Sequence, residues 1–271
     1  MAQDGPWQDL RVLIAVKTYP QPSEKHLETV CTAGVTEEGR WVRLYPIPFR
    51  MLESDQQYSK WVWVRARARR RGKDPRPESF KVDVDSIRVE RPTGSLNVLW
   101  AGRCRLLLPT VSPSLEAIQA RRERDGTSLG LFRPARIEGL RIVPDPDHRE
   151  TQAKINRLRQ RSGIPGIVGQ SSPLQALPVK FEYSFSCQDA ACRGHTMCLF
   201  DWEIAQAWRK WRRNYPEKEL PDKLRETWIH RLFEDRRGHF IVGTLQAHPT
   251  TFTLIGYFSP PRVVPGMLPL F

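Results

Sequence analysis

The segment FSCQDAACRGHTMCLFDWE, residues 185–203, carries the side chains with the clearest chemistry in the chain. Its cysteines and histidine fall within twelve residues: Cys187, Cys192, His195 and Cys198. Zn²⁺ takes four thiolate or imidazole ligands in a tetrahedron, and close spacing lets one stretch of backbone supply several of them. The segment therefore predicts a structural zinc site with these four ligands, although a familiar finger or knuckle would open with Cys-x2-Cys.

Cys198 leaves this ligand set open to an alternative, because it lies in the apolar, strand-like stretch TMCLF. A cysteine in such a stretch can pack as a small buried hydrophobic residue. The zinc site would then need a fourth ligand from elsewhere in the chain, for which His248 and Cys31 are the candidates.

The same segment also permits a catalytic metal site. His195, Asp201 and Glu203 combine an imidazole with the hard carboxylates that suit Mg²⁺ or Mn²⁺ in phosphodiester hydrolysis. The competing interpretation is structural, because acidic residues at the start of a helix cap backbone N–H groups and favour the helix dipole. The complete deaminase signature, His-x-Glu followed by Pro-Cys-x-x-Cys, does not occur.

The elements around the segment follow from its flanks. Alternating aromatic and polar residues over 177–187 predict a strand that enters it. Asp201 is the expected N-cap of the helix that leaves it. A second helix over 221–235 and a closing hairpin over 239–261 complete a β, site, α, α, β order.

The first ninety or so residues consist of short predicted strands. They fall at 10–20, 28–35, 40–49, 60–71 and 80–90. The turn TEEGR joins the second and third as a hairpin, and the alternation of the last one slips near Ser86, as at a β-bulge. Five short, strongly twisted strands suit a small closed barrel of the oligonucleotide/oligosaccharide-binding (OB) kind.

The middle of the chain gives less regular patterns. We expect a strand over 99–109, a short polar helix over 114–126, and two strands over 128–144 that break at Pro134. The stretch 150–173 begins as a basic helix and ends rich in Gly, Pro and Ser, which favours a mobile loop.

The chain is strongly basic: 43 Lys and Arg face 30 Asp and Glu, which gives a formal charge of +13 and a pI near 9.9. Such an excess favours a polyanionic partner. The strand at 60–71 adds a face of alternating aromatic and cationic residues, which could stack on bases and contact phosphates. In the competing interpretation the tryptophans are core and the arginines are a solvated edge.

Two further segments supply candidates for nucleic-acid binding. The loop KTYPQPSEK lies between the first predicted strands, where OB-folds bind their ligands, although two prolines equally suit a rigid turn. The helix WRKWRRNY presents a basic outer face that could be merely solvated. The full candidate set is Lys17, Tyr19, Lys25, Trp61, Trp63, Arg65, Arg67, Arg69, Arg209, Arg212 and Arg213.

The sequence also indicates the cellular compartment of the protein. The longest apolar runs, such as LRVLIAV, are far shorter than the roughly 20 residues of a membrane span, and the start lacks the features of a signal peptide. Five cysteines, three of them crowded beside His195, fit reduced thiols better than disulfides. We therefore expect a soluble, cytoplasmic protein without a membrane partner.

Four stretches together resemble a known bacterial family, described as the dual OB-containing domain. They are VKTYPQPSEKHLETVCTAGVTEEGRWVRLYPIPFR, SLGLFRPARI, FEYSFSCQDAACRGHTMCLFDWE and GTLQAHPTTFTLIGYFSPP. The resemblance implies two OB-like barrels in one protein, often in genomic neighbourhoods linked to conflict with phage or mobile elements. It implies no particular reaction and no catalytic residues.

The sequence thus predicts a mainly β protein with α insertions (α+β): a first OB-like barrel over 1–108 and a second OB-like lobe over 109–271 with helices and the zinc cluster. The predicted function is binding of single-stranded RNA or DNA, by a protein that acts with a partner protein as the recognition component of a bacterial defence or mobile-element system. We expect binding rather than catalysis. The alternatives are a metal-dependent nuclease centred on His195, Asp201 and Glu203, and an adaptor whose basic surface binds an acidic protein.

Overall fold

The computed structural model describes residues 4–161 and 173–264. Most of the Gly/Pro/Ser stretch predicted as a loop, residues 162–172, lies outside the described residues. The helices of the described part are too short or too polar to cross a lipid bilayer.

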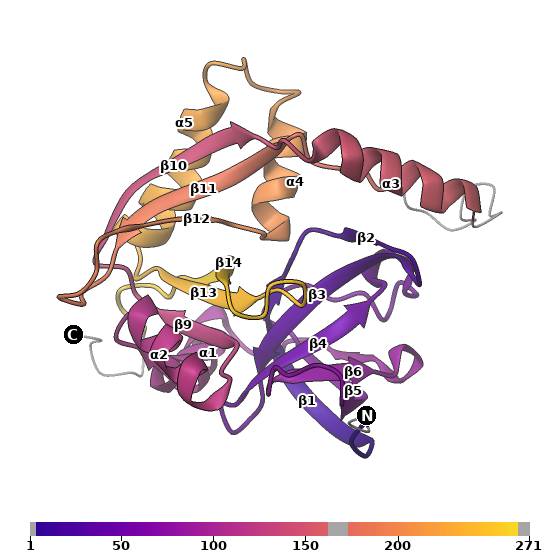
Figure 1. The fold of residues 1–271 in the computed structure, drawn as a ribbon. Coiled ribbons are helices and arrows are strands. Elements are labelled where there is room, and N and C mark those ends of the chain that lie inside the picture. The colour runs from indigo at the N-terminus through magenta and orange to yellow at the C-terminus, as the bar shows by residue number, and fades with distance from the viewer. Residues whose placement is uncertain (1–3, 162–172, 265–271) are drawn as a thin grey trace.

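The first part of the chain closes into a five-stranded barrel (Figure 1). Its strands are β1 (Gln8–Lys17), β3 (Leu27–Val35), β4 (Trp41–Ile47), β5 (Trp63–Arg70) and β6 (Ser79–Val82). They pair in the order β1-β3-β4-β6-β5, and β5 returns to pair with β1. The β4–β6 pairing is parallel and the others are antiparallel. The predicted closed barrel is therefore present, with β2 (Gln21–Ser23) added to β3 and β7 (Arg88–Glu90) to β5.

The residue pattern explains why these strands close. In β5 the small apolar residues Val64, Ala66 and Ala68 are buried inside the barrel, whereas the arginines between them face outward. At Gly34 a Cβ would overlap the carbonyl oxygen of Leu13, so glycine permits the close approach of β1 and β3. The predicted bulge near residue 86 is a full interruption: a 3₁₀ turn, Val84–Ser86, separates β6 from β7.

The strands of the second part form two sheets. The four-stranded sheet has the order β14-β13-β9-β8 and the three-stranded sheet the order β10-β11-β12. The first contains β8 (Val111–Ser112), β9 (Leu129–Phe132), β13 (His239–Thr244) and β14 (Phe252–Phe258); the second contains β10 (Arg136–Pro144), β11 (Val179–Ser186) and β12 (His195–Cys198). The mainly β, α+β class is confirmed. Among the described residues, however, these pairings do not close a second ring.

The helices are α1 (Leu96–Leu107), α2 (Leu115–Asp125), α3 (His148–Arg161), α4 (Trp202–Trp211) and α5 (Leu220–Arg225), which continues as a π-helix, Glu226–Glu234. Short 3₁₀ turns lie at Phe49–Met51 and Leu108–Thr110.

The prediction of a strand over 99–109 is wrong, because helix α1 covers most of these residues. Ala101, Cys104 and Leu107 are buried three residues apart, so the apolar positions form one stripe of a helix that Ser95 caps.

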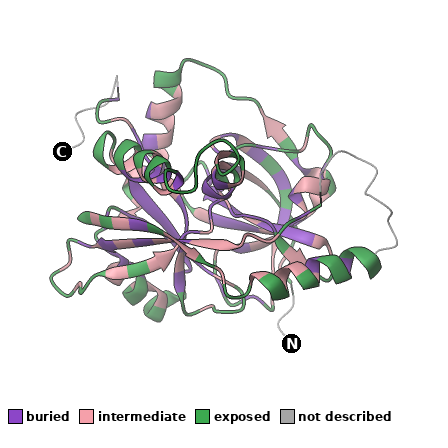
Figure 2. Ribbon diagram, turned by 90° about the horizontal axis from the view of Figure 1, so that it is seen from above, coloured by how far each residue is buried: buried purple, intermediate pink, exposed green. Residues whose placement is uncertain are grey.

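The two parts share a hydrophobic core. Leu13 and Val35 of the barrel belong to one buried cluster with Ile241, Ile255 and Phe258 of the second part. Figure 2 shows buried positions running through strands of both parts, whereas α3 is exposed along most of its length. A site at the contact between the parts can therefore be held as firmly as one inside either part.

Candidate binding cavity and metal-ligand cluster

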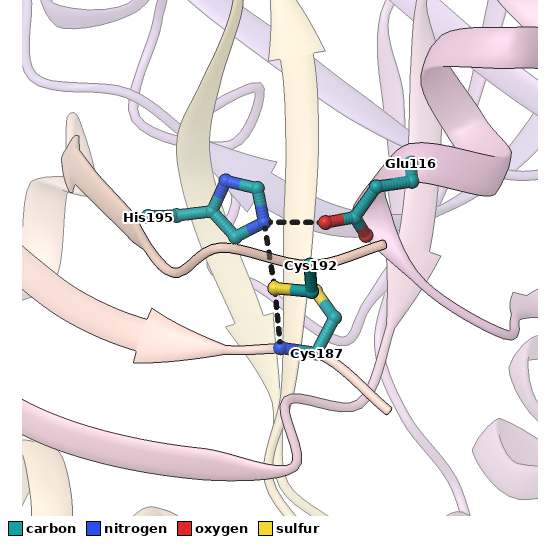
Figure 3. Close-up of side chains that lie close together, drawn as sticks. All are labelled: Glu116, Cys187, Cys192 and His195. Atoms are coloured by element: carbon teal, nitrogen blue, oxygen red, sulfur yellow. Dashed lines mark hydrogen bonds and ion pairs between the residues drawn. The ribbon is translucent and has the colours of Figure 1, made fainter. Parts of the chain in front are cut away.

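Four potential metal ligands meet where the start of α2 faces the β11–β12 hairpin. Figure 3 shows the side chains of Glu116, Cys187, Cys192 and His195 pointing toward one another. Their ligand atoms all lie within 4.8 Å of one another. Two thiols, one imidazole and one carboxylate form a donor set that suits Zn²⁺.

Local structure fixes each member of this cluster. Ser114 is the N-cap of α2, where it accepts a hydrogen bond from the Ala117 N–H, and its hydroxyl donates to Asp189 of the hairpin loop over 3.1 Å. Gly194 adopts a positive φ of 85°, which lets the loop turn back into β12 at His195. The hairpin loop is thus tied to the helix that carries Glu116.

The ligand atoms contact one another directly. His195 Nε2 lies 2.8 Å from Glu116 Oε1 and 3.3 Å from Cys192 Sγ. The backbone N–H groups of Cys187 and Gly194 donate to the Cys192 sulfur over 3.1 and 3.4 Å. Glu116 Oε2 is buried and has no hydrogen-bond partner among the described residues. Burial raises the pKa of the Cys187 thiol to about 12, so this thiol is neutral unless a cation joins it.

The structure brings together three of the four predicted zinc ligands and adds Glu116 in place of Cys198. Alternate residues of a strand face opposite sides, so Cys198, three positions after His195, points away from the cluster. Its sulfur lies 4.0 Å from Glu182 Oε1. Neither Cys31, which lies in β3, nor His248, which follows β13, belongs to the group.

The predicted nuclease residues fall into two separate clusters. Asp201 caps α4 as predicted, accepting from the N–H groups of Glu203 and Ile204. Both carboxylates bind the ammonium of Lys60, at 2.5 Å from Asp201 and 3.0 Å from Glu203. Burial lowers the pKa of Lys60, but the two carboxylates outweigh this effect and raise it overall. The two carboxylates therefore share the ammonium of Lys60 and lie apart from the cluster that contains His195.

The basic face of β5 lies outside the barrel, where its charges are paired. The ion pairs are Arg65–Glu90, Arg67–Asp83 and Arg69–Asp4. The guanidinium of Arg11 covers Trp63 at 4.3 Å from the ring centroid, and Trp61 packs against Phe258. These contacts occupy groups that would otherwise meet bases and phosphates, so binding by this face stays a prediction.

Lys17, which the sequence places in a ligand loop, lies among aromatic side chains. Its ammonium is 3.6 Å from the ring centroid of Phe49 and 4.7 Å from that of Trp202, and it donates to the Tyr58 carbonyl over 2.8 Å. Burial, with repulsion from Lys60, lowers the pKa of Lys17 to about 8. This residue therefore stabilises the contact between the barrel and α4.

Two other predicted residues do meet. Arg209 of α4 donates to the hydroxyl of Tyr19 over 2.7 Å. Lys25, Arg212 and Arg213 are exposed, and the guanidinium of Arg212 lies over the ring of Trp208.

Tyr19 also lines a cavity of about 460 Å³ on the face of the barrel, which we call the barrel-face cavity. The barrel contributes Thr18, Tyr19, Gln21, Thr29, Cys31, Arg43, Tyr45 and Arg76. The second part contributes Phe200, Thr244, Leu245, Gln246, Ala247 and Ile255. Figure 1 shows the turn of the β13–β14 hairpin beside β3, and Leu245, Gln246 and Ala247 of that turn line the cavity. Of the residues that the sequence predicts to bind nucleic acid, Tyr19 lines this cavity, whereas Lys17 and Lys25 do not.

The polar wall of the cavity is rigid. Arg43, 1% exposed, donates to the hydroxyls of Ser79 and Ser128. Arg76, 4% exposed, forms a two-pronged ion pair with Asp74 and donates to the Thr244 carbonyl over 2.9 Å. The Thr244 hydroxyl is buried and has no hydrogen-bond partner among the described residues. The two arginines that line the cavity are thus held in place by hydrogen bonds within the protein.

Two family models cover most of the chain. One, described as a domain of unknown function (DUF8758), matches residues 8–109, and another, described as a domain of unknown function (DUF8757), matches residues 111–269. No curated protein matches the chain. Neither description names a ligand or a reaction, so any function must be argued from the sites themselves.

Proposed function

The chain belongs to the family described as a domain of unknown function (DUF8757), and we propose that it binds single-stranded RNA or DNA through the barrel-face cavity. The observation that carries this proposal is the position of the cavity on the barrel. It is lined by the second and third barrel strands, β3 and β4, by the loop after the first strand, and by Arg76 in the loop between the fourth and fifth. OB-folds, five-stranded Greek-key barrels, bind oligonucleotides with these elements.

The chemistry of the cavity suits a nucleotide. Tyr45 and Phe200, both half-buried, offer aromatic rings, on which bases of any sequence can stack. Arg76 uses three of its five N–H groups on Asp74 and Thr244, which leaves donors for a base edge or a phosphate. The volume of about 460 Å³ is within the range of small-ligand pockets, about 300–1,000 Å³, which favours one unstacked nucleotide over a run of bases.

The charge of the chain supports a strand that continues beyond the cavity. The formal charge is +13, and Arg209 contacts Tyr19 at the cavity wall. Each phosphate that a cation neutralises releases counterions, so affinity should fall steeply with salt. A role in bacterial defence stays a prediction from the family resemblance alone. The nuclease alternative loses its support, because Lys60 binds the carboxylates of Asp201 and Glu203.

Fluorescence anisotropy with short labelled single strands of RNA and DNA tests this function. Tyr45→Ala should weaken binding roughly 5- to 150-fold, the equivalent of about 1–3 kcal/mol for one stacked base. Tyr45→Phe keeps the ring and should bind like the parent. Arg67→Ala is the matched control outside the cavity, because Arg67 is paired with Asp83 on the outer face.

Three results would contradict the proposal. The first is an affinity that does not change with salt or with Tyr45→Ala. The second is loss of binding in the Arg65, Arg67 and Arg69 alanine variants with no effect of Tyr45→Ala, which would assign binding to the outer face of β5. A free mononucleotide that binds as tightly as the strand would indicate a small-molecule pocket instead.

A further inference from the structure

We propose that Glu116, Cys187, Cys192 and His195 bind one structural Zn²⁺, which fastens helix α2 to the β11–β12 hairpin. This proposal is independent of nucleic-acid binding. It differs from the ligand set that the sequence predicts, because the fourth ligand is the carboxylate of Glu116 and Cys198 takes no part.

The spacing of the ligand atoms suits a tetrahedral ion. Zinc bonds of about 2.0–2.3 Å give ligand-to-ligand edges of roughly 3.3–3.8 Å in a tetrahedron. The four ligand atoms lie within 4.8 Å of one another, and His195 Nε2 is already 3.3 Å from Cys192 Sγ. Shifts of about one ångström or less would bring the distances between ligand atoms to these tetrahedral edges, and rotation of the side chains can supply such shifts.

One carboxylate oxygen of the cluster has no partner in the part of the chain that the structure describes, and a bound cation would supply one. His195 Nε2 contacts Glu116 Oε1, whereas Glu116 Oε2 is buried and has no hydrogen-bond partner among the described residues. The ion pairs of the described residues give Glu116 the imidazole of His195 but no lysine or arginine. Buried polar atoms normally have partners, so an orphaned carboxylate oxygen facing two thiols points to a bound metal.

The donor types select the metal and its role. Two thiolates disfavour Mg²⁺ and Ca²⁺, whereas sulfur, imidazole and carboxylate together suit Zn²⁺. All four positions are protein side chains, as in structural sites, which keep no open position for water or substrate. On binding, the two thiols release their protons to solvent while sulfur, nitrogen and oxygen bond to the ion.

The surroundings support the four ligands. The N–H groups of Cys187 and Gly194 donate to the Cys192 sulfur, and the imidazole of His195 packs on the ring of Phe185. Such contacts orient metal ligands. Glu116 lies 79 residues from His195 along the chain, so the ion would join elements that the sequence keeps far apart.

Elemental analysis of the full chain, purified without chelator, should find close to one zinc per chain. Cys192→Ser should lose the metal and lower the melting temperature, and Glu116→Ala should hold zinc more weakly than the parent. Cys198→Ser is the matched control and should keep one zinc. Zinc-free protein whose melting temperature is unchanged in Cys192→Ser would overturn the site, and loss of zinc in Cys198→Ser with retention in Glu116→Ala would overturn this ligand set.

A second measurement serves if Cys192→Ser does not fold. The parent chain, loaded with Co²⁺ in place of zinc, should show near-ultraviolet charge transfer from thiolate to cobalt and the intense visible bands of a tetrahedral ion. Cobalt that binds without thiolate charge transfer would overturn the proposal. None of these readouts uses nucleic acid, so they stand or fail separately from the proposed function.

Discussion

Replacing Lys60 with methionine leaves the buried carboxylate of Asp201 without the ammonium that faces it. The Lys60 side chain is 3% exposed and that of Asp201 is fully buried, with the ion pair at 2.5 Å. At about 3 Å and an effective dielectric constant of about 20, two unit charges attract by roughly 5–6 kcal/mol. Desolvation offsets much of this attraction, but a single buried charge left alone has no such compensation.

We therefore expect Lys60→Met to lower the free energy of unfolding by about 3–5 kcal/mol. Equilibrium unfolding in urea measures this loss as a shift of the midpoint at constant slope. The double variant Lys60→Met, Asp201→Asn should recover most of it, because asparagine caps a helix as well as aspartate does and carries no charge.

The exposed pair Arg67–Asp83 provides the control. Its arginine side chain is 56% exposed, so Arg67→Met should cost no more than about 1 kcal/mol. A Lys60→Met variant as stable as Arg67→Met would refute the argument that the barrel and α4 are joined by a buried ion pair. So would a double variant less stable than Lys60→Met alone.

Two further changes test the core. Burial lowers the pKa of His239 to about 4, so between about pH 6.5 and pH 4 the unfolded chain binds a proton that the folded chain does not, and stability should fall as the pH falls through this range. In urea unfolding at a series of pH values, His239→Phe should reduce that slope, and an unchanged slope would contradict the assignment. Gly34→Ala should cost about 3 kcal/mol, because its Cβ would overlap the Leu13 carbonyl and push β1 from β3; a loss below about 1 kcal/mol would show that the strands give way easily.

Local patterns predicted much of the fold. The alternation in β5 puts Val64, Ala66 and Ala68 on one face of the strand, and the structure buries all three. The N-cap at Asp201 was also predictable, because capping depends on a side chain and the N–H groups two or three residues later. Helix α1 was missed because the apolar run LLLP, in which it ends, also suits a strand, and only the buried stripe distinguishes the two.

The candidate site depends on contacts between distant segments. Glu116 is one acidic residue in the first turn of a helix, where acidic residues are common for reasons of the helix dipole. The residues next to it in the sequence do not mark it as a metal ligand, because its partner His195 lies 79 residues further along the chain. Sequence patterns could name the cysteines and the histidine but not the ligand that completes them.

For the basic face of β5, the sequence pattern predicts which residues share a face but not which partners they have. Arg65 and Arg67 alternate with apolar residues, and the structure places them outside the barrel. Their carboxylate partners, Glu90 and Asp83, come from the neighbouring strand and turn. A pattern within one strand therefore reports where charges lie but not whether they are free for a ligand.

The barrel-face cavity belongs to neither half of the chain alone. Its barrel wall, from Thr18 to Arg76, lies within residues 8–109, and its remaining wall, from Phe200 to Ile255, lies within residues 111–269. The barrel by itself would offer an open face, on which a strand could lie along several bases. Because Leu245, Gln246 and Ala247 of the β13–β14 turn line the cavity, the second half adds a second wall to that face and narrows it to a half-open site of about 460 Å³. The selectivity of the proposed site must therefore come from residues of both halves together.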